Sequence, residues 1–257
     1  MGYYFPKGMR FSTLEERVKF YTWEFDVTRV AEWFRGRSDK IHFAVIIGRH
    51  TRIFPEKYAE DASTTIIIDE YENLEDVKLQ IIDFAPEGVY YDRNIYGDYG
   101  EVLGQELAFD LDPENITCPV HGTLADKMSR HQGFSFCELE FEMVKDQTLE
   151  LYEHLKKQFS KLSVVYSGRG FHIHVFDEDA YRLSMEERAK MARLIKEQGI
   201  QIDEWVTSGE MRLIRLPHSL NGLVSRIVLP LEIMELRTFN PVNDKRCIPR
   251  FLEESTS

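Results

Sequence analysis

The chain has 257 residues, of which 43% are hydrophobic and 30% are charged, the ordinary balance of a soluble globular protein. This length is enough for one large domain or for two closely packed modules. The net charge of −12 argues against a general nucleic-acid coating protein, because phosphate binding depends on Lys and Arg.

The sequence shows no signal for a membrane or for secretion. It has no run of ~18 apolar residues, the length needed to span a bilayer, and its N-terminal stretch lacks the apolar core of a signal peptide. Three cysteines in a chain of this size favour a reducing compartment. We therefore expect a cytoplasmic protein with no membrane partner.

The residue pattern predicts strands and helices that alternate loosely along the chain. A capping box from Ser12 to Glu15 begins the first helix, and a second box from Ser184 to Glu187 begins the last. The predicted helices are 12–25, 146–160 and 184–199. The predicted strand regions are 41–48, 64–69, 106–112 and 163–176, the last interrupted by a tight turn. The fold class is therefore α/β or α+β.

Two carboxylates stand on one face of the strand predicted at 106–112. Successive side chains of a strand point to opposite faces, so Ala108, Asp110 and Asp112 share the face opposite the apolar residues. The two acids lie about 7 Å apart along the strand, and two Mg²⁺ or Mn²⁺ ions would offset their repulsion. The alternative is a strand end with solvated acids, followed by Pro113.

A second candidate site is the turn 167–170 and the strand after it. Its glycines let backbone amides approach a phosphate closely. Arg169 lies in the turn, and His172 and His174 share one face of the strand, in a stretch (163–176) that contains no acid. These groups suit a triphosphate. The alternative is a simple hairpin with two satisfied histidines.

The third segment runs from Asp203 to the loop after Pro217. Asp203 is placed to complete a metal site. Between 205 and 231 a single acid, Glu210, stands against three arginines, so a polyanion would be held in a local groove. Arg212 and Arg215 cannot both face the same side of a regular strand. The alternative is a surface hairpin with these arginines paired to nearby acids.

In this order, "ELAFDLD", "YSGRGFHIHV" and "IDEWVTSGEMRLIRLPHSLNG" resemble the three catalytic motifs of the archaeo-eukaryotic primase superfamily, and most closely those of the small catalytic subunit of archaeal and eukaryotic DNA primases. Upstream, "APEGVYYDRNIYGD" is similar to the family's approach to its first motif, and "GRHTRIF" to an N-terminal segment. The resemblance implies an α/β (α+β) catalytic core, with the active site between an N-terminal αβ module and a module like an RNA-recognition motif. It also implies two-metal, template-directed nucleotidyl transfer.

Carried over residue by residue, the resemblance makes Asp110, Asp112 and Asp203 the catalytic and metal-binding acids. The residues it assigns to nucleotide binding are Ser167, Gly168, Arg169, His172, Arg215, Ser219 and Arg226. There are two departures from the family pattern. The second motif has one residue fewer between its Ser-Gly and its His, and Leu223 stands where many relatives carry a Lys, so triphosphate binding would depend on Arg215 or Arg226.

The segment after the first motif resembles the zinc knob of family members, which predicts a zinc-binding insertion at 113–138. Cys118, His121 and Cys137 match its ligands, and tetrahedral zinc takes four N or S ligands. His131 is the expected fourth ligand, since the last cysteine is absent and Glu140 occupies a nearby spacing. The alternative is that the zinc has been lost.

The sequence thus predicts one catalytic domain over 1–257, a DNA primase–polymerase that uses Mg²⁺ or Mn²⁺ and a structural Zn²⁺, in the cytoplasm of an archaeal-type cell. Its expected partners are a single-stranded DNA template, nucleoside triphosphates and a large primase subunit. The alternatives are an end-joining repair polymerase, a mobile-element primase–polymerase, a catalytically silent single-strand-binding subunit, and a two-metal nuclease.

Overall fold

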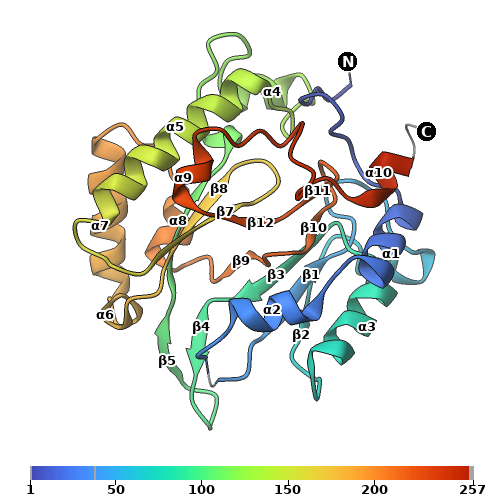
Figure 1. Ribbon diagram of the computed structural model, residues 1–257, viewed down its shortest axis with the longest axis horizontal. Coiled ribbons are helices and arrows are strands. Elements are labelled where there is room, and N and C mark those ends of the chain that lie inside the picture. Colours follow the sequence, from blue (N-terminus) through green and yellow to red (C-terminus); the bar gives the residue numbers. More distant parts are fainter. Residues whose placement is uncertain (1, 38, 255–257) are drawn as a thin grey trace. The chain divides into compact units, whose positions relative to one another are not determined.

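The computed structural model describes residues 2–37 and 39–254, which divide into two compact units (Figure 1). The first unit consists of residues 2–8, Arg93–Arg212 and Pro230–Phe239. The second consists of Met9–Asp92, Leu213–Leu229 and residues 240–254. Each unit therefore draws on separate stretches of the chain.

The first unit is built on a four-stranded sheet in the order β12-β7-β8-β6. Its strands are β6 (Leu107–Leu111), β7 (Leu162–Tyr166), β8 (Phe171–Val175) and β12 (Leu229–Leu231). Strand β8 pairs antiparallel with both β6 and β7, so the strand regions predicted at 106–112 and 163–176 are neighbours. The predicted apolar face of β6 is buried, because Leu107, Phe109 and Leu111 are each at most 1% exposed.

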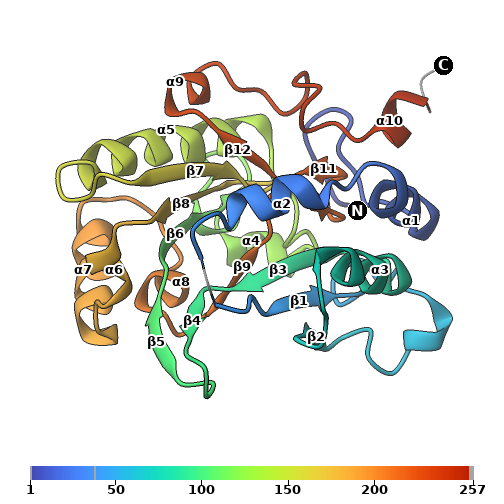
Figure 2. The same ribbon diagram turned by 60° about the horizontal axis from the view of Figure 1, so that its bottom comes forward.

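Helices pack on this sheet from segments between its strands. Helix α5 (Glu138–Leu155) runs along β7 and β8 (Figure 2), and the ring centroid of its Phe141 lies 5.4 Å from that of Phe171. It begins well before residue 146, the start predicted from the sequence. Helix α7 (Met185–Glu197) follows the predicted box, in which Ser184 caps the helix and Glu187 bonds back to it. Helix α8 (Glu204–Ser208) packs against α7 and β6.

The remaining elements of the first unit are short. They are β4 (Asn94–Tyr96), β5 (Val102–Gln105), the 3₁₀ turn η2 (Pro113–Asn115), α4 (Leu124–Ser129), α6 (Glu178–Tyr181) and α9 (Ile233–Leu236). The succession β6-α5-β7-β8-α7-β12 is a β-α-β-β-α-β order. It agrees with the expected module like an RNA-recognition motif.

The second unit has its own antiparallel sheet in the order β2-β1-β3-β9. Its strands are β1 (Phe43–Ile46), β2 (Thr65–Ile68), β3 (Gly88–Asp92) and β9 (Leu213–Arg215), and a small hairpin is formed by β10 (Leu220–Asn221) and β11 (Arg226–Ile227). Its helices are α1 (Leu14–Trp23), α2 (Val27–Trp33), α3 (Leu74–Phe84), α10 (Arg250–Glu254) and the 3₁₀ turn η1 (Glu56–Tyr58).

Helix α1 begins one residue later than the sequence predicts. Its capping box runs from Thr13 to Glu16, not from Ser12 to Glu15. Ser12 is fully buried, and its hydroxyl donates to the carbonyl of Gly222 and accepts from Arg17. A tertiary contact therefore takes the hydroxyl that would otherwise cap the helix.

The fold is a mixed α+β architecture with antiparallel sheets, as predicted. Within the described part of the chain, no helix combines the length and the apolar character needed to cross a membrane.

Candidate functional site

Asp110 and Asp112 lie at the end of β6 in the first unit. Asp110 is directly opposite His172 in the β6–β8 register, with 3.5 Å between Oδ1 and Nε2. Asp112 follows the last residue of the strand and caps the turn η2, where it accepts a hydrogen bond of 3.0 Å from the Glu114 amide. Their side chains are 26% and 17% exposed, so both carboxylates are accessible to a small ion.

Asp203 joins these acids from a distant part of the sequence. Its amide donates a 2.9 Å hydrogen bond to the carbonyl of Asp110, which fixes the start of α8 beside β6. Its side chain caps α8 and accepts a 2.8 Å bond from the amide of Trp205. The third predicted acid is therefore held next to the first by the backbone itself.

The turn 167–170 is pressed against the end of β6. The amide of Ser167 donates to the Gly170 carbonyl, and the Gly170 amide donates to the Ser167 hydroxyl. Gly168 has a left-handed backbone with φ of 103°. A Cβ on Gly170 would lie 2.0 Å from the carbonyl oxygen of Leu111 and 2.9 Å from the Cα of Asp112. Only glycine permits this approach.

Arg169 places its guanidinium among the acids. It is 6% exposed and contacts Asp112 at 2.7 Å and Glu114 at 3.3 Å. Burial by itself would lower the pKa of Arg169, but the charges of the neighbouring carboxylates outweigh it and raise that pKa. Arg169 is therefore a fixed positive charge that offsets the repulsion between the acids.

Glu114 is a site residue that the sequence reasoning missed. The negative charge of Asp112, followed by burial, raises the pKa of Glu114, and Asp203 adds to the shift. The sequence signal for Glu114 is its position two residues after Asp112 and directly after Pro113. This position points to the site only once the η2 turn, which brings Glu114 to Arg169, is known.

The two histidines of β8 have different surroundings. His172 is 4% exposed and faces Asp110. His174 is fully buried, with Nδ1 at 2.7 Å from Oε1 of the equally buried Glu106. His174 is thus a core histidine held by Glu106, close to the structural alternative that the sequence left open, and its ring centroid lies 5.7 Å from that of His172.

The other predicted nucleotide-binding residues belong to the second unit. Arg215 lies with its guanidinium carbon 4.8 Å from the ring centroid of Tyr90 and donates to the Tyr90 hydroxyl. Ser219 is fully buried and donates to the Leu216 carbonyl. Arg226 is 1% exposed and donates to the carbonyls of Pro241 and Ser225. These contacts are internal to the unit, and nucleotide binding by the three residues stays a prediction.

The insertion after β6 forms a compact cluster of metal-ligand types. Ligand atoms of Cys118, His121, Cys137 and Glu140 all lie within 4.8 Å of one another. The Cys118 sulfur is 3.3 Å from His121 Nδ1 and 3.9 Å from the Cys137 sulfur. Zn–S and Zn–N bonds of about 2.3 and 2.0 Å in a tetrahedron put ligand atoms roughly 3.5–3.8 Å apart, so the donor set fits zinc.

The fourth group of this cluster is Glu140, whereas the sequence predicted His131. His131 lies in a turn after α4 with a positive φ of 58° and is outside the cluster. Glu140 lies in the first turn of α5, where its carboxylate accepts the amide of Cys137 at 2.9 Å. Its other oxygen is 2.7 Å from Lys127 Nζ, and both side chains are fully buried.

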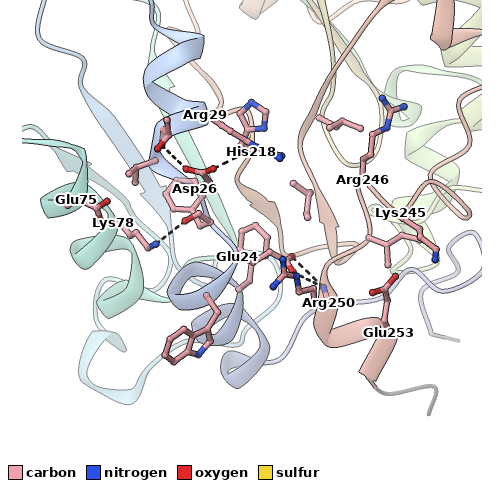
Figure 3. Close-up of a pocket in the computed structure, with 18 residues that line it drawn as sticks. Glu24, Asp26, Arg29, Glu75, Lys78, His218, Lys245, Arg246, Arg250 and Glu253 are labelled. Atoms are coloured by element: carbon pink, nitrogen blue, oxygen red, sulfur yellow. Dashed lines mark hydrogen bonds and ion pairs between the residues drawn. The ribbon is translucent and has the colours of Figure 1, made fainter.

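A pocket of about 720 Å³ lies in the second unit (Figure 3). Both basic and acidic side chains line it, and Glu24 and Asp26 are ion-paired with Arg250 and Arg29. Burial, followed by the charge of Arg29, lowers the pKa of His218 in its wall to about 4. Among the described residues that line it, none is a predicted site residue.

Comparison with models of known protein families gives no match. A DNA primase small subunit-like protein of Archaeoglobus fulgidus, itself uncharacterized, is 52% identical over 272 residues, covering 99% of this chain and 96% of the relative. The chain belongs to this family, within the archaeo-eukaryotic primase superfamily.

More distant members of the primase family match part of their length. The DNA primase small subunit of Pyrobaculum calidifontis is 27% identical, over 65% of this chain and 66% of the relative. That of Pyrococcus horikoshii is 26% identical, over 75% of this chain and 51% of the relative. The chain thus spans half to two thirds of these subunits.

A solved structure supports the fold. The polymerase domain of ligase D from Mycobacterium tuberculosis, in complex with DNA, superposes with a TM-score of 0.52 over 95% of this chain and 88% of that domain, at 14% identity. At this identity the likeness concerns the fold alone.

Proposed function

We propose that this chain is a template-directed nucleotidyltransferase of the primase–polymerase type. The observation that supports it most is the meeting of Asp110, Asp112 and Asp203 beside Arg169 and His172, in a chain of the primase family. Carboxylates that are held close together repel one another and destabilise the fold. Such locally unfavourable arrangements are expected at functional sites.

Asp110, Asp112 and Asp203 would hold the divalent cations of this reaction. The donor set is all oxygen, which suits Mg²⁺ and Mn²⁺. Two such ions held by these carboxylates would supply the charge stabilisation that phosphoryl transfer requires. The chain's own residues orient the acids: the Asp110 carbonyl anchors Asp203, and Trp205 and Glu114 amides fix the carboxylates of Asp203 and Asp112.

Arg169 and His172 are the basic groups next to these acids, so we assign the triphosphate of the incoming nucleotide to them. Charge-assisted bonds from guanidinium and imidazolium to phosphate are strong. The rigid turn 167–170 would hold Arg169 in place while the substrate changes, which is positioning rather than covalent catalysis.

The Cys118–His121–Cys137–Glu140 cluster would hold one structural zinc. Two thiolates and a carboxylate carry three negative charges, and a zinc ion with the buried Lys127 ammonium carries three positive charges. The cluster is therefore neutral only when Lys127 is counted, which gives a reason for a fully buried lysine. Such closed sites contribute to folding and leave no position for substrate.

The test is nucleotide incorporation on single-stranded DNA with Mg²⁺ or Mn²⁺, with and without a primer. Incorporation without a primer is the expected result and identifies a primase. Incorporation only from an existing 3′ end would indicate a polymerase of the repair type. Binding of single-stranded DNA without incorporation, or cleavage of the DNA, would refute the proposal in favour of a silent binding subunit or a nuclease.

A further inference from the structure

The N-terminal segment 2–8 is bound to the insertion that carries the Cys/His cluster. The amide of Tyr4 donates to the Ser135 hydroxyl at 3.1 Å, and the amide of Phe136 donates to the Tyr4 carbonyl at 3.2 Å. The side-chain amide of Gln132 donates to the Gly2 carbonyl. Both parts belong to the first unit, so the segment is an integral layer over the insertion.

Aromatic side chains of this segment pack directly on the insertion. Phe5 meets Phe136 edge to face, with ring centroids 6.0 Å apart. The ring of Tyr4 stacks on the imidazole of His121, with centroids 4.4 Å apart and planes inclined by 27°. His121 is a member of the metal-ligand cluster, so Tyr4 covers one of its proposed ligands.

The hydroxyl group of Tyr4 is buried, and among the residues that the structure describes it has no hydrogen-bond partner. Burial raises the pKa of Tyr4 to about 12, and neighbouring negative charges add to the shift. Those charges are Glu140, Cys137 and Cys118. The phenol O–H is a hydrogen-bond donor, and it lies near three groups that are anions when they bind a metal.

We propose that Tyr4 closes the metal site: its hydroxyl donates a hydrogen bond to an anionic ligand of the cluster, and its ring holds His121 in the ligating orientation. This inference rests on the proposed zinc. Groups that hydrogen-bond to metal ligands typically change metal affinity by about 10–100-fold when they are removed. A buried donor without a partner is costly, and metal binding supplies the acceptor.

The proposal links zinc to the N-terminal segment. If docking of residues 2–8 strengthens zinc binding by a given factor, zinc must strengthen docking by the same factor, because the two equilibria are coupled. Zinc in the insertion would thus fix the segment that leads into the second unit, whose first residue is Met9.

The decisive variants are Tyr4→Phe and, as a matched control, Tyr3→Phe. Tyr4→Phe keeps the ring on His121 and removes only the hydroxyl. Tyr3 is 42% exposed, and its ring packs against Phe5 and Phe134. Zinc affinity is measured on the full chain by competition with a chelator. We expect zinc to bind about 10–100-fold more weakly to Tyr4→Phe and unchanged to Tyr3→Phe.

A second readout separates this role from a purely structural one. Without metal, Tyr4→Phe should be at least as stable as the natural chain, since it removes an unsatisfied buried hydroxyl. Hydrogen exchange at the amides of Tyr4 and Phe136 should slow when zinc is added, and less so in Tyr4→Phe.

Equal zinc affinity of Tyr4→Phe and the natural chain would overturn the inference while leaving the zinc site in place. A natural chain that binds no zinc would overturn both, and the two failures are distinguishable in the same titration.

Discussion

Replacing Gly170 by Ala tests whether the turn 167–170 sets the position of the acids. The new Cβ would lie 2.0 Å from the Leu111 carbonyl oxygen and 2.9 Å from the Asp112 Cα, against an ordinary contact of 3.4–4 Å. Both obstacles are backbone, so the turn and the end of β6 must separate by more than about 1 Å. Asp112 and its partner Arg169 lie on opposite sides of that gap.

The expected cost has two parts. Overpacking of a tight interior contact destabilises by roughly 1–3 kcal/mol, and a displacement of about 1 Å in a catalytic group lowers turnover by about 100-fold. We therefore expect Gly170→Ala to fold with a reduced free energy of unfolding, measured by denaturant titration, and to lose at least about 100-fold in kcat/KM for nucleotide incorporation.

Gly199→Ala is the matched control. Gly199 follows α7 with a left-handed φ of 93° and has nothing within 4 Å of its Cβ position, so Ala there costs about 1–2 kcal/mol in backbone strain alone. This variant should lose stability and keep its activity. If Gly170→Ala were as active as Gly199→Ala, the close approach of the turn would not position the acids, and the reasoning would be wrong.

Three further predictions concern single groups. Asp110→Asn and Asp203→Asn should keep the fold, and the thermal stability of the metal-free chain should be equal or higher because repulsion between the acids is relieved. Both variants should lose nucleotide incorporation by orders of magnitude. Near-normal activity in either variant would contradict the metal assignment. His172→Ala should raise the nucleotide KM more than the Kd for single-stranded template, as measured by steady-state kinetics and fluorescence anisotropy, and the reverse pattern would exclude a triphosphate role. Metal analysis of protein purified without added zinc should give about one equivalent of zinc per chain. The zinc content should fall sharply in Cys118→Ser and less in Lys127→Met, which removes only the balancing charge. A metal-free chain with full activity would refute the proposed zinc site.

The sequence was sufficient wherever a local rule acts alone. Alternation of side chains along a strand correctly predicted that Phe109 and its neighbours are buried. The capping box at Ser184 correctly predicted the start of α7. At α1 two boxes overlap in "STLEE", and local rules cannot choose between Ser12 and Thr13. The choice is made by the Gly222 carbonyl, which takes the Ser12 hydroxyl, and such long-range contacts are absent from a local pattern.

The acids show the same division. The order of the motifs singled out Asp110, Asp112 and Asp203. The strand predicted at 106–112, however, included Asp112 on one of its faces, whereas β6 ends at Leu111. Pro113 ends the ladder because it has no amide to donate, so Asp112 becomes the cap of η2 instead. The η2 turn redirects the chain after β6 and brings Glu114 into contact with Arg169. The side-chain periodicity of a strand could not have predicted this contact.

Glu140, and not the predicted His131, is the fourth group of the metal-ligand cluster, for a structural reason. The preference of zinc for N and S ligands favoured His131. Helix α5, however, begins at Glu138 and puts Glu140 in its first turn, where the carboxylate accepts a hydrogen bond from the Cys137 amide. That bond and the one to Lys127 use one acceptor site on each oxygen, and a carboxylate offers about four in all. Glu140 can therefore cap the helix, hold Lys127 and still face a metal. A neutral imidazole has a single acceptor nitrogen, so a histidine at this place could do only one of these things.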